Sequence, residues 1–127
     1  MRIEHIALYA TDLEGMRDFF IRYFSARSGE LYHNAKTDFR SYFLSFEDGA
    51  RLEIMTRPCL TQAPDSPVHP GFIHMAVSVG TRDKVDALTA QMKADGYKVL
   101  SGPRTTGDGY YESCIMGPEN IQIEITV

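Results

Sequence analysis

The sequence has no tryptophan, only two cysteines, and no apolar stretch long enough to cross a bilayer as a helix. Cys59 and Cys114 lie 55 positions apart without a Cys-x-x-Cys pair, which argues against a redox motif or a zinc ribbon and favours two reduced thiols. Basic residues are also too few for a nucleic acid surface, because 13 Lys and Arg stand against 17 Asp and Glu, a formal net charge of −4. We therefore expect neither nucleic acid nor a membrane as a partner.

The sequence does have enough apolar material for a folded core. Of its 127 residues, 43% are hydrophobic and 24% are charged, proportions that are typical of one globular domain. The first residues enter an alternating pattern at once and lack the apolar region of a secretory signal, so a cytoplasmic location is expected.

The prolines indicate how the chain is organised. Four of the six lie in the segment 58–70, which is typical of a linker. We therefore predict one domain, residues 1–127, made of a first module at 1–57, this proline-rich linker and a second module at 71–127.

The first module has the pattern of a strand, a helix and three further strands. The strand is predicted at residues 3–9. The helix is indicated by apolar residues at steps of three or four, with Thr11 or Asp12 as its cap: Leu13, Met16, Phe20 and Tyr23. The further extended stretches are predicted at 30–34, 40–46 and 51–57, with a hairpin turn at 47–49.

The second module repeats this order. A strand is predicted at 72–79, and a helix capped by Thr81 and ended by Gly96 carries Val85, Leu88 and Met92 on one face. Three strands then follow, at 97–101, 110–117 and 121–127. Residues 5–8 resemble residues 74–77, and residues 51–54 resemble residues 122–125, so the chain reads as two βαβββ modules.

Two histidines and two glutamates hold matching places in the modules. His5 and His74 are 69 positions apart, and Glu53 and Glu124 are 71 apart. Alternate side chains of a strand point to opposite faces, and each of these four lies opposite the apolar residues of its strand. We therefore expect the apolar faces to pack on the two helices, and the opposite faces to line a concavity that holds two imidazoles and two carboxylates.

These four side chains suit a borderline divalent metal ion. Zn²⁺ and Ni²⁺ are the preferred candidates, and Co²⁺, Fe²⁺ and Mn²⁺ are also compatible. Four protein ligands leave two positions of an octahedral shell for waters or a bidentate substrate. A single strand histidine or glutamate is more often exposed or hydrogen-bonded than metal-bound, so the matching of the two pairs carries this prediction.

The double βαβββ order, with His on the first strand of each module and Glu on the last, resembles the vicinal oxygen chelate superfamily, which contains glyoxalase I. The resemblance covers essentially the whole chain and implies an α+β fold, in which the two modules form a cupped, incomplete β-barrel with the metal inside. The matching residues are the glyoxalase I ligand set, one by one: His5, Glu53, His74 and Glu124. Extradiol dioxygenases and fosfomycin-modifying transferases generally carry His at the second position and methylmalonyl-CoA epimerases carry Gln, so Glu53 favours the glyoxalase I type.

The resemblance implies a metal-dependent lyase or isomerase of the lactoylglutathione lyase type, acting by proton transfer on a small α-oxygenated substrate such as a hemithioacetal. The ion would polarise two adjacent substrate oxygens and lower the pKa of a neighbouring C–H. Glu124 is assigned as the base and Glu53 as its counterpart for returning the proton. Bacterial enzymes of this type place an arginine that binds glutathione shortly after the first histidine, where this chain has Tyr9 and Ala10. Whether the substrate contains glutathione or another thiol is therefore left open.

Four further side chains are candidate substrate contacts. Tyr9 shares the face of His5 on the first strand. Residues 102–112 are glycine-rich and polar, and they predict a loop that could close over a substrate, with Arg104 pairing with a carboxylate or phosphate. Tyr110 or Glu112, depending on strand register, would reach the cavity; an ordinary solvated hairpin loop is the alternative.

The first helix also carries more aromatic residues than one buried stripe needs: Phe19, Phe20, Tyr23 and Phe24. Part of that helix is therefore predicted to meet a second subunit in a homodimer, as the family resemblance also implies.

Two other functions remain open at this point. One is a metal-free small-molecule binding protein of the bleomycin-resistance type, against which the four ligand residues argue, because a sequestering pocket does not need them. The other is a different metal-dependent activity of the superfamily, namely a transferase, dioxygenase or epimerase. Dioxygenases use two His and one carboxylate, so a fourth ligand argues against that activity.

Overall fold

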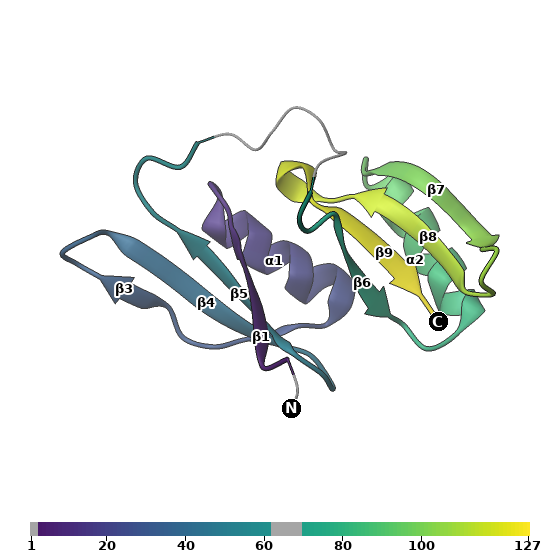
Figure 1. Ribbon diagram of the computed structural model, residues 1–127, viewed down its shortest axis with the longest axis horizontal. Coiled ribbons are helices and arrows are strands. Elements are labelled where there is room, and N and C mark those ends of the chain that lie inside the picture. Colours follow the sequence, from purple (N-terminus) through teal and green to yellow (C-terminus); the bar gives the residue numbers. More distant parts are fainter. Residues whose placement is uncertain (1–2, 62–69) are drawn as a thin grey trace. The chain divides into compact units, whose positions relative to one another are not determined.

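The structure is a computed structural model that describes residues 3–61 and 70–127. The chain divides into two compact units, Met1–Ala63 and Pro64–Val127, and each is a β-sheet with one helix packed on one face (Figure 1). The α+β class expected from the sequence is confirmed. Most of the linker predicted at 58–70 lies outside the described residues.

Over residues 3–61 the first unit contains one helix and five strands: β1 (His5–Tyr9), α1 (Leu13–Phe24), β2 (Arg27–Ser28), β3 (Tyr32–Asn34), β4 (Phe39–Ser45) and β5 (Arg51–Thr56). Its sheet has the order β1-β5-β4-β2, with β3 also pairing with β4, and β1 runs parallel to β5. The stretch predicted at 30–34 contains β3, whereas β2 was not predicted. Both pair with β4, so one long strand serves two short partners.

The helix α1 follows its predicted apolar stripe. Asp12 caps it by accepting a hydrogen bond from the Gly15 backbone N–H at 2.9 Å. The stripe is buried, and so are the additional aromatic residues Phe19 and Phe24. These aromatic side chains therefore do not form the exposed surface, predicted from their number, on which part of this helix could meet a second subunit.

The described part of the second unit, from residue 70 on, has one helix, four strands and a 3₁₀ turn: β6 (His74–Ser78), α2 (Arg82–Ala94), β7 (Lys98–Thr105), β8 (Tyr111–Met116), η1 (Pro118–Asn120) and β9 (Gln122–Thr126). Its sheet has the order β6-β9-β8-β7, with β6 parallel to β9. Thr81 caps α2 as predicted, accepting from the Lys84 N–H at 3.3 Å.

The long loop predicted over residues 102–112 is wrong at its first end. The strand β7 continues to Thr105, because its pairing with β8 overrides the local glycine and proline content. Gly102 has a φ of +78°, and a Cβ there would lie 2.4 Å from the Glu112 carbonyl oxygen, so glycine is what lets the two strands approach.

The predicted burial of the apolar strand faces holds for the inner strands and fails at the edges. In β5 and β9 the side chains on the predicted apolar faces are at most 2% exposed: Leu52, Ile54, Ile123 and Ile125. By contrast, Ile6 is 36% exposed and Ile73, just before β6, is 45% exposed. Ile6 belongs to the edge strand β1, and Ile73 directly precedes the edge strand β6; each of these strands has a neighbouring strand on one side within its own sheet.

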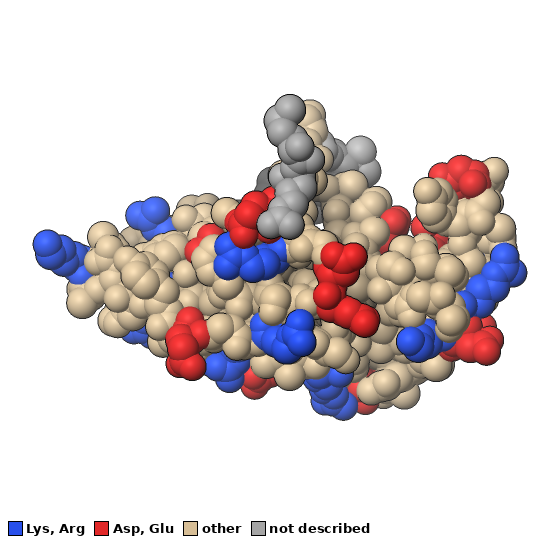
Figure 2. All heavy atoms as spheres, turned by 90° about the horizontal axis from the view of Figure 1, so that it is seen from below, with Lys and Arg blue, Asp and Glu red and all other residues tan. Residues whose placement is uncertain are grey.

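Charges of both signs share the surface. On the face seen in Figure 2, Lys and Arg side chains alternate with Asp and Glu and do not gather by sign. Among the described residues, no helix has the length and apolar character needed to span a membrane.

Candidate functional site

The parallel strand pairs β1–β5 and β6–β9 place a histidine and a glutamate in the same register in each unit. His5 pairs with Arg51, and Glu53 follows two residues further along β5. His74 pairs with Gln122, and Glu124 follows two residues further along β9. Because side chains two residues apart share a face, each His and Glu point to the same side of their sheet. That side is opposite the face on which the helix packs, since the buried residues of β5 and β9 have the other parity.

In the second unit the two predicted ligands are in contact. The His74 Nε2 lies 3.2 Å from the Glu124 Oε2, and the two side chains are 37% and 22% exposed. Two ligand atoms that share one ion at about 2.1 Å each are separated by about 3.0 to 3.4 Å for angles between octahedral and tetrahedral values. The pair therefore has the spacing that a shared divalent ion requires, and it also serves as an ion pair when His74 is protonated.

In the first unit His5 contacts Glu4 instead of Glu53. The His5 Nδ1 lies 2.6 Å from the Glu4 Oε2, and the Arg51 Nε donates to the Glu4 Oε1 at 2.8 Å. These hydrogen bonds, from His5 and then from Arg51, lower the pKa of the Glu4 carboxyl. The rings of His5 and Phe43 pack in a T-shaped arrangement with their centroids 5.4 Å apart.

Each unit supplies one imidazole and one carboxylate, which is half of the predicted ligand set. Within either unit, residues 3–61 and 70–127 include no group of three or more His, Cys, Asp or Glu side chains that could hold an ion alone. The donors nevertheless fit a borderline divalent ion, because they are nitrogen and carboxylate oxygen atoms on matching strand positions.

Of the candidate substrate contacts in the second unit, Glu112 lies on the same sheet face as Glu124. It is the β8 neighbour of Thr126, so it shares the parity of the predicted site, and its side chain is 15% exposed. Arg104 lies directly across from it on β7, with the Arg104 Nη2 4.0 Å from the Glu112 Oε1.

The two tyrosine candidates are more exposed. Tyr110 precedes β8 in the hairpin turn and is 59% exposed, with its backbone N–H donating to the Thr106 hydroxyl at 3.0 Å. Tyr9 ends β1 on the His5 side and is 48% exposed. The strand register was expected to decide whether Tyr110 or Glu112 reaches the predicted site. Of these two residues, Glu112 is the one that lies on the strand.

Sequence reasoning missed Cys114, which lies directly opposite Glu124 in the antiparallel pair β8–β9. Its side chain is buried, at 8% exposed, and burial, followed by the charges of Glu124 and Glu112, raises the pKa of the thiol. In the first unit Phe43 holds the equivalent place opposite Glu53. The alternation of Glu112 and Cys114 along one strand was the signal that could have placed this thiol on the site face.

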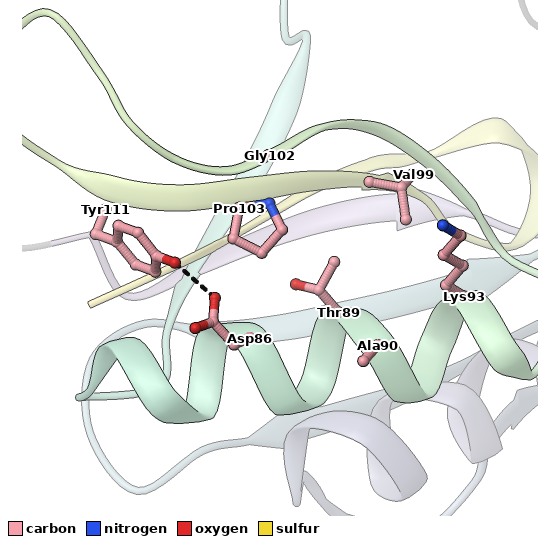
Figure 3. A pocket seen from close by; sticks show the side chains of 8 residues that line it. All are labelled: Asp86, Thr89, Ala90, Lys93, Val99, Gly102, Pro103 and Tyr111. Carbon is pink, nitrogen blue, oxygen red and sulfur yellow. Dashed lines mark hydrogen bonds between the residues drawn. The ribbon is translucent and has the colours of Figure 1, made fainter.

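A cavity of about 420 Å³ lies on the other side of the second sheet, between α2 and the strands β7 and β8 (Figure 3). Its lining residues are Asp86, Thr89, Ala90, Lys93, Val99, Gly102, Pro103 and Tyr111. The Tyr111 hydroxyl donates to the Asp86 Oδ1 at 2.6 Å, across the cavity mouth. None of the predicted ligands is among these lining residues, so this cavity is a gap between helix and sheet and not the predicted site.

The model of the glyoxalase/bleomycin resistance protein/dioxygenase superfamily matches residues 2–125. Among curated proteins, the uncharacterized protein YqjT of Bacillus subtilis (strain 168) is 28% identical over 133 aligned positions, which cover 97% of this chain and 96% of YqjT.

Solved structures share the fold at lower identity. The trypanothione-dependent glyoxalase I of Leishmania major has a TM-score of 0.78 at 16% identity, covering 99% of this chain and 86% of that one. The fosfomycin resistance protein FosX of Listeria monocytogenes, solved with Mn(II) and sulfate, has a TM-score of 0.73 at 17% identity, covering 98% and 90%. At these identities the similarity establishes the fold.

Proposed function

The chain belongs to the glyoxalase/bleomycin resistance protein/dioxygenase superfamily, and from this membership we propose that it is a metal-dependent lyase or isomerase of the glyoxalase I type. Its substrate would be a small α-oxygenated compound, such as a hemithioacetal, and its reaction a proton transfer between adjacent carbons. Members of the superfamily with the same fold include a glyoxalase I and a FosX solved with Mn(II).

Four side chains of this chain would hold the ion: His5, Glu53, His74 and Glu124. When bound, a divalent ion supplies Lewis-acid polarisation of the substrate oxygens, which acidifies the neighbouring C–H. Zn²⁺ and Ni²⁺ are the preferred ions for two imidazoles and two carboxylates.

The glutamates would carry the proton. Glu124 would accept it from one substrate carbon, and Glu53 would return a proton to the adjacent carbon, so that hydrogen moves between the two carbons and the carbon skeleton is unchanged. Proton exchange between the two glutamates or with solvent would then restore both side chains for the next turnover. Glu112, on the same sheet face as Glu124, and the facing Arg104 would contact the polar end of the substrate.

One observation supports this proposal above the others. The strand register places Glu two residues beyond the partner of His in both units, and in the second unit the two ligand atoms lie 3.2 Å apart. A single exposed histidine beside a glutamate is common, whereas here the same offset recurs on the matching face of both sheets and supplies imidazole and carboxylate, the donor types that such an ion takes.

The first test is the metal content of untagged protein, measured by elemental analysis before and after incubation with Ni²⁺ or Zn²⁺. We expect close to one ion per chain in the wild type and none in the double variant His5→Ala/His74→Ala. The control is His33→Ala, because His33 is an exposed histidine bound to Asp38 outside the site, and its loss should leave the metal content unchanged. A wild type that stays empty would overturn the proposal and favour a metal-free binding protein of the bleomycin-resistance type.

The second test is turnover of hemithioacetals formed from methylglyoxal with several thiols. Glu53→Gln and Glu124→Gln should each abolish turnover. Glu30→Gln should leave it unchanged, because Glu30 is exposed and is not one of the four predicted ligands. Full activity in the Glu53→Gln/Glu124→Gln double variant would exclude this mechanism. The homodimer and the cytoplasmic location expected from the sequence remain predictions, and sedimentation of the metal-loaded protein checks the first of them.

A further inference from the structure

The Glu4 carboxylate joins the imidazole of His5 to the guanidinium of Arg51. Its Oε2 lies 2.6 Å from the His5 Nδ1, and its Oε1 accepts from the Arg51 Nε at 2.8 Å and lies 2.5 Å from the Arg51 Nη2. The backbone tightens this cluster, because the Arg51 N–H donates to the Glu4 carbonyl oxygen at 3.0 Å and Arg51 is the strand partner of His5. Both oxygens of the carboxylate are therefore engaged.

The hydrogen bond to Glu4 decides which nitrogen of His5 carries the proton. An ionised carboxylate can only accept, so the Nδ1 must be the N–H donor. In a neutral imidazole the lone pair is then on Nε2, and a metal ion binds a nitrogen through its lone pair. Phe43 also restricts the orientation of the imidazole, because the two rings pack in a T-shaped arrangement. The Arg51 guanidinium in turn lies 4.1 Å from the centre of the Phe43 ring.

We propose that Glu4 is a positioning residue for the metal site, which fixes the Nδ1–H tautomer of His5 and so presents Nε2 as the ligand, with Arg51 holding Glu4 in place. This inference rests on the proposed function, because it assumes that His5 binds an ion. A carboxylate behind a ligating histidine orients the ring and makes it more basic, and loss of such a partner typically weakens metal binding by about 10- to 100-fold.

Among residues 70–127 the second unit shows no equivalent of this cluster. The residue before His74 is Ile73, and the strand partner of His74 is Gln122 where that of His5 is Arg51. His74 instead directs its Nε2 at Glu124. The two histidines are therefore different ligands, with His5 held from behind by a carboxylate and His74 facing its partner ligand directly.

The test compares Glu4→Gln with the wild type in two measurements. Nitrogen-15 spectra of the imidazoles in metal-free protein, at about pH 8.5 where histidine is neutral, report the tautomer. We expect the Nδ1–H form for His5 in the wild type and a substantial share of the Nε2–H form in Glu4→Gln, because a neutral amide can either accept or donate. Calorimetric titration with Zn²⁺ should then show an affinity lower by about 10- to 100-fold in the variant.

The chain offers a matched control at a second cluster of the same kind. Asp38 bridges His33 and Arg40, each at 2.8 Å, and all three side chains are exposed as Glu4 and His5 are. Asp38→Asn should change the tautomer of His33 and leave the Zn²⁺ affinity unaltered. Glu4→Asp, which keeps the charge, should restore part of the affinity that Glu4→Gln loses.

The outcomes separate this inference from the proposed function. If the wild type binds Zn²⁺ and Glu4→Gln binds it equally well, or if His5 is an Nε2–H tautomer in the wild type, Glu4 has no positioning role and the proposed function stands. If the wild type binds neither Zn²⁺ nor Ni²⁺, the proposed function fails and the metal part of this inference with it, while the spectra still decide whether Glu4 sets the tautomer of His5.

Discussion

Cys114 and Glu124 are direct neighbours across the antiparallel strands β8 and β9, on the face of the second sheet that carries His74. The thiol is buried, and this burial, together with the negative charges of Glu124 and Glu112, raises its pKa. A thiolate would therefore be disfavoured beside the candidate metal ligand. The site face of the second unit is acidic, whereas Phe43 makes the equivalent position of the first unit aromatic.

The raised pKa of Cys114 predicts unequal thiol reactivity. Cys59 is exposed, so at about pH 8 a water-soluble disulfide reagent should modify it at least about tenfold faster than Cys114. In a Cys59→Ser background, Glu124→Gln should speed the reaction of Cys114, because it removes a charge that opposes thiolate formation. Equal rates for both cysteines, or no change on removing the charge, would contradict the placement of Cys114.

The sequence predicted the helices and inner strands because their burial is periodic. The α1 stripe and the alternating apolar residues of β5 and β9 are buried as expected. Each of these elements is covered on one face only, the helix by a sheet and the strands by a helix. Two features escaped this reasoning. A two-residue strand such as Arg27–Ser28 is too short to show a period, and β7 runs through Gly102 because a partner strand stabilises it.

For the candidate site, the sequence predicted which residue types share a face but not which atoms meet. His74 and Glu124 are in contact, but His5 turns to Glu4, a neighbour that strand alternation would place on the other side. Glu4 precedes the first paired residue of β1, so the alternation does not govern it. The alternation of Glu112 and Cys114 already indicated the face of this thiol, but its place opposite Glu124 depends on the β8–β9 register, which the whole sheet sets.

The hydrogen bonds of the Tyr42 hydroxyl are predicted to contribute measurably to the stability of the first unit. Its side chain is buried, and its hydroxyl donates to the Glu14 Oε1 at 2.8 Å and accepts from the Arg17 Nη1 at 3.1 Å. Tyr42→Phe should lower the free energy of unfolding by about 1 kcal/mol, measured by urea denaturation. Tyr111→Phe, which removes the hydroxyl bond to Asp86 from a half-buried ring, should cost less. An equal or larger loss at Tyr111 would show that the α2 contact is the stronger one.

Asp38 predicts an acid-sensitive contact at the β3–β4 hairpin. Its hydrogen bonds, first from His33 and then from Arg40, lower the pKa of the carboxyl below its usual value. The unfolded chain therefore binds the proton more readily, so the contribution to stability is present above the unfolded pKa and is lost as the pH falls through the folded one. Carbon-13 titration of the Asp38 carboxyl should show the lowered pKa, and His33→Gln should raise it toward the ordinary value. Because the three side chains are exposed, we expect only a small change in the unfolding midpoint.

The hydrogen bond between Thr89 and Ser113 predicts that two single substitutions differ clearly in how much they lower the free energy of unfolding. Both are buried between α2 and β8, their hydroxyl oxygens are 2.6 Å apart, and the Thr89 hydroxyl is bonded to the Val85 carbonyl oxygen, also at 2.6 Å. Since Thr89 donates to that carbonyl, Ser113 must be the donor to Thr89. Removing Ser113 therefore leaves Thr89 satisfied, whereas removing the Thr89 hydroxyl leaves Ser113 buried without a partner.

We accordingly expect Thr89→Val to lower the free energy of unfolding by about 1 to 3 kcal/mol and Ser113→Ala to lower it by less. The double variant should be more stable than the sum of the two losses implies, because it leaves no orphaned hydroxyl at this point. Urea denaturation of the four proteins in one double-mutant cycle measures this coupling. Strict additivity would mean that the two hydroxyls do not share a bond in solution, and a larger loss from Ser113→Ala would reverse the assigned direction of donation.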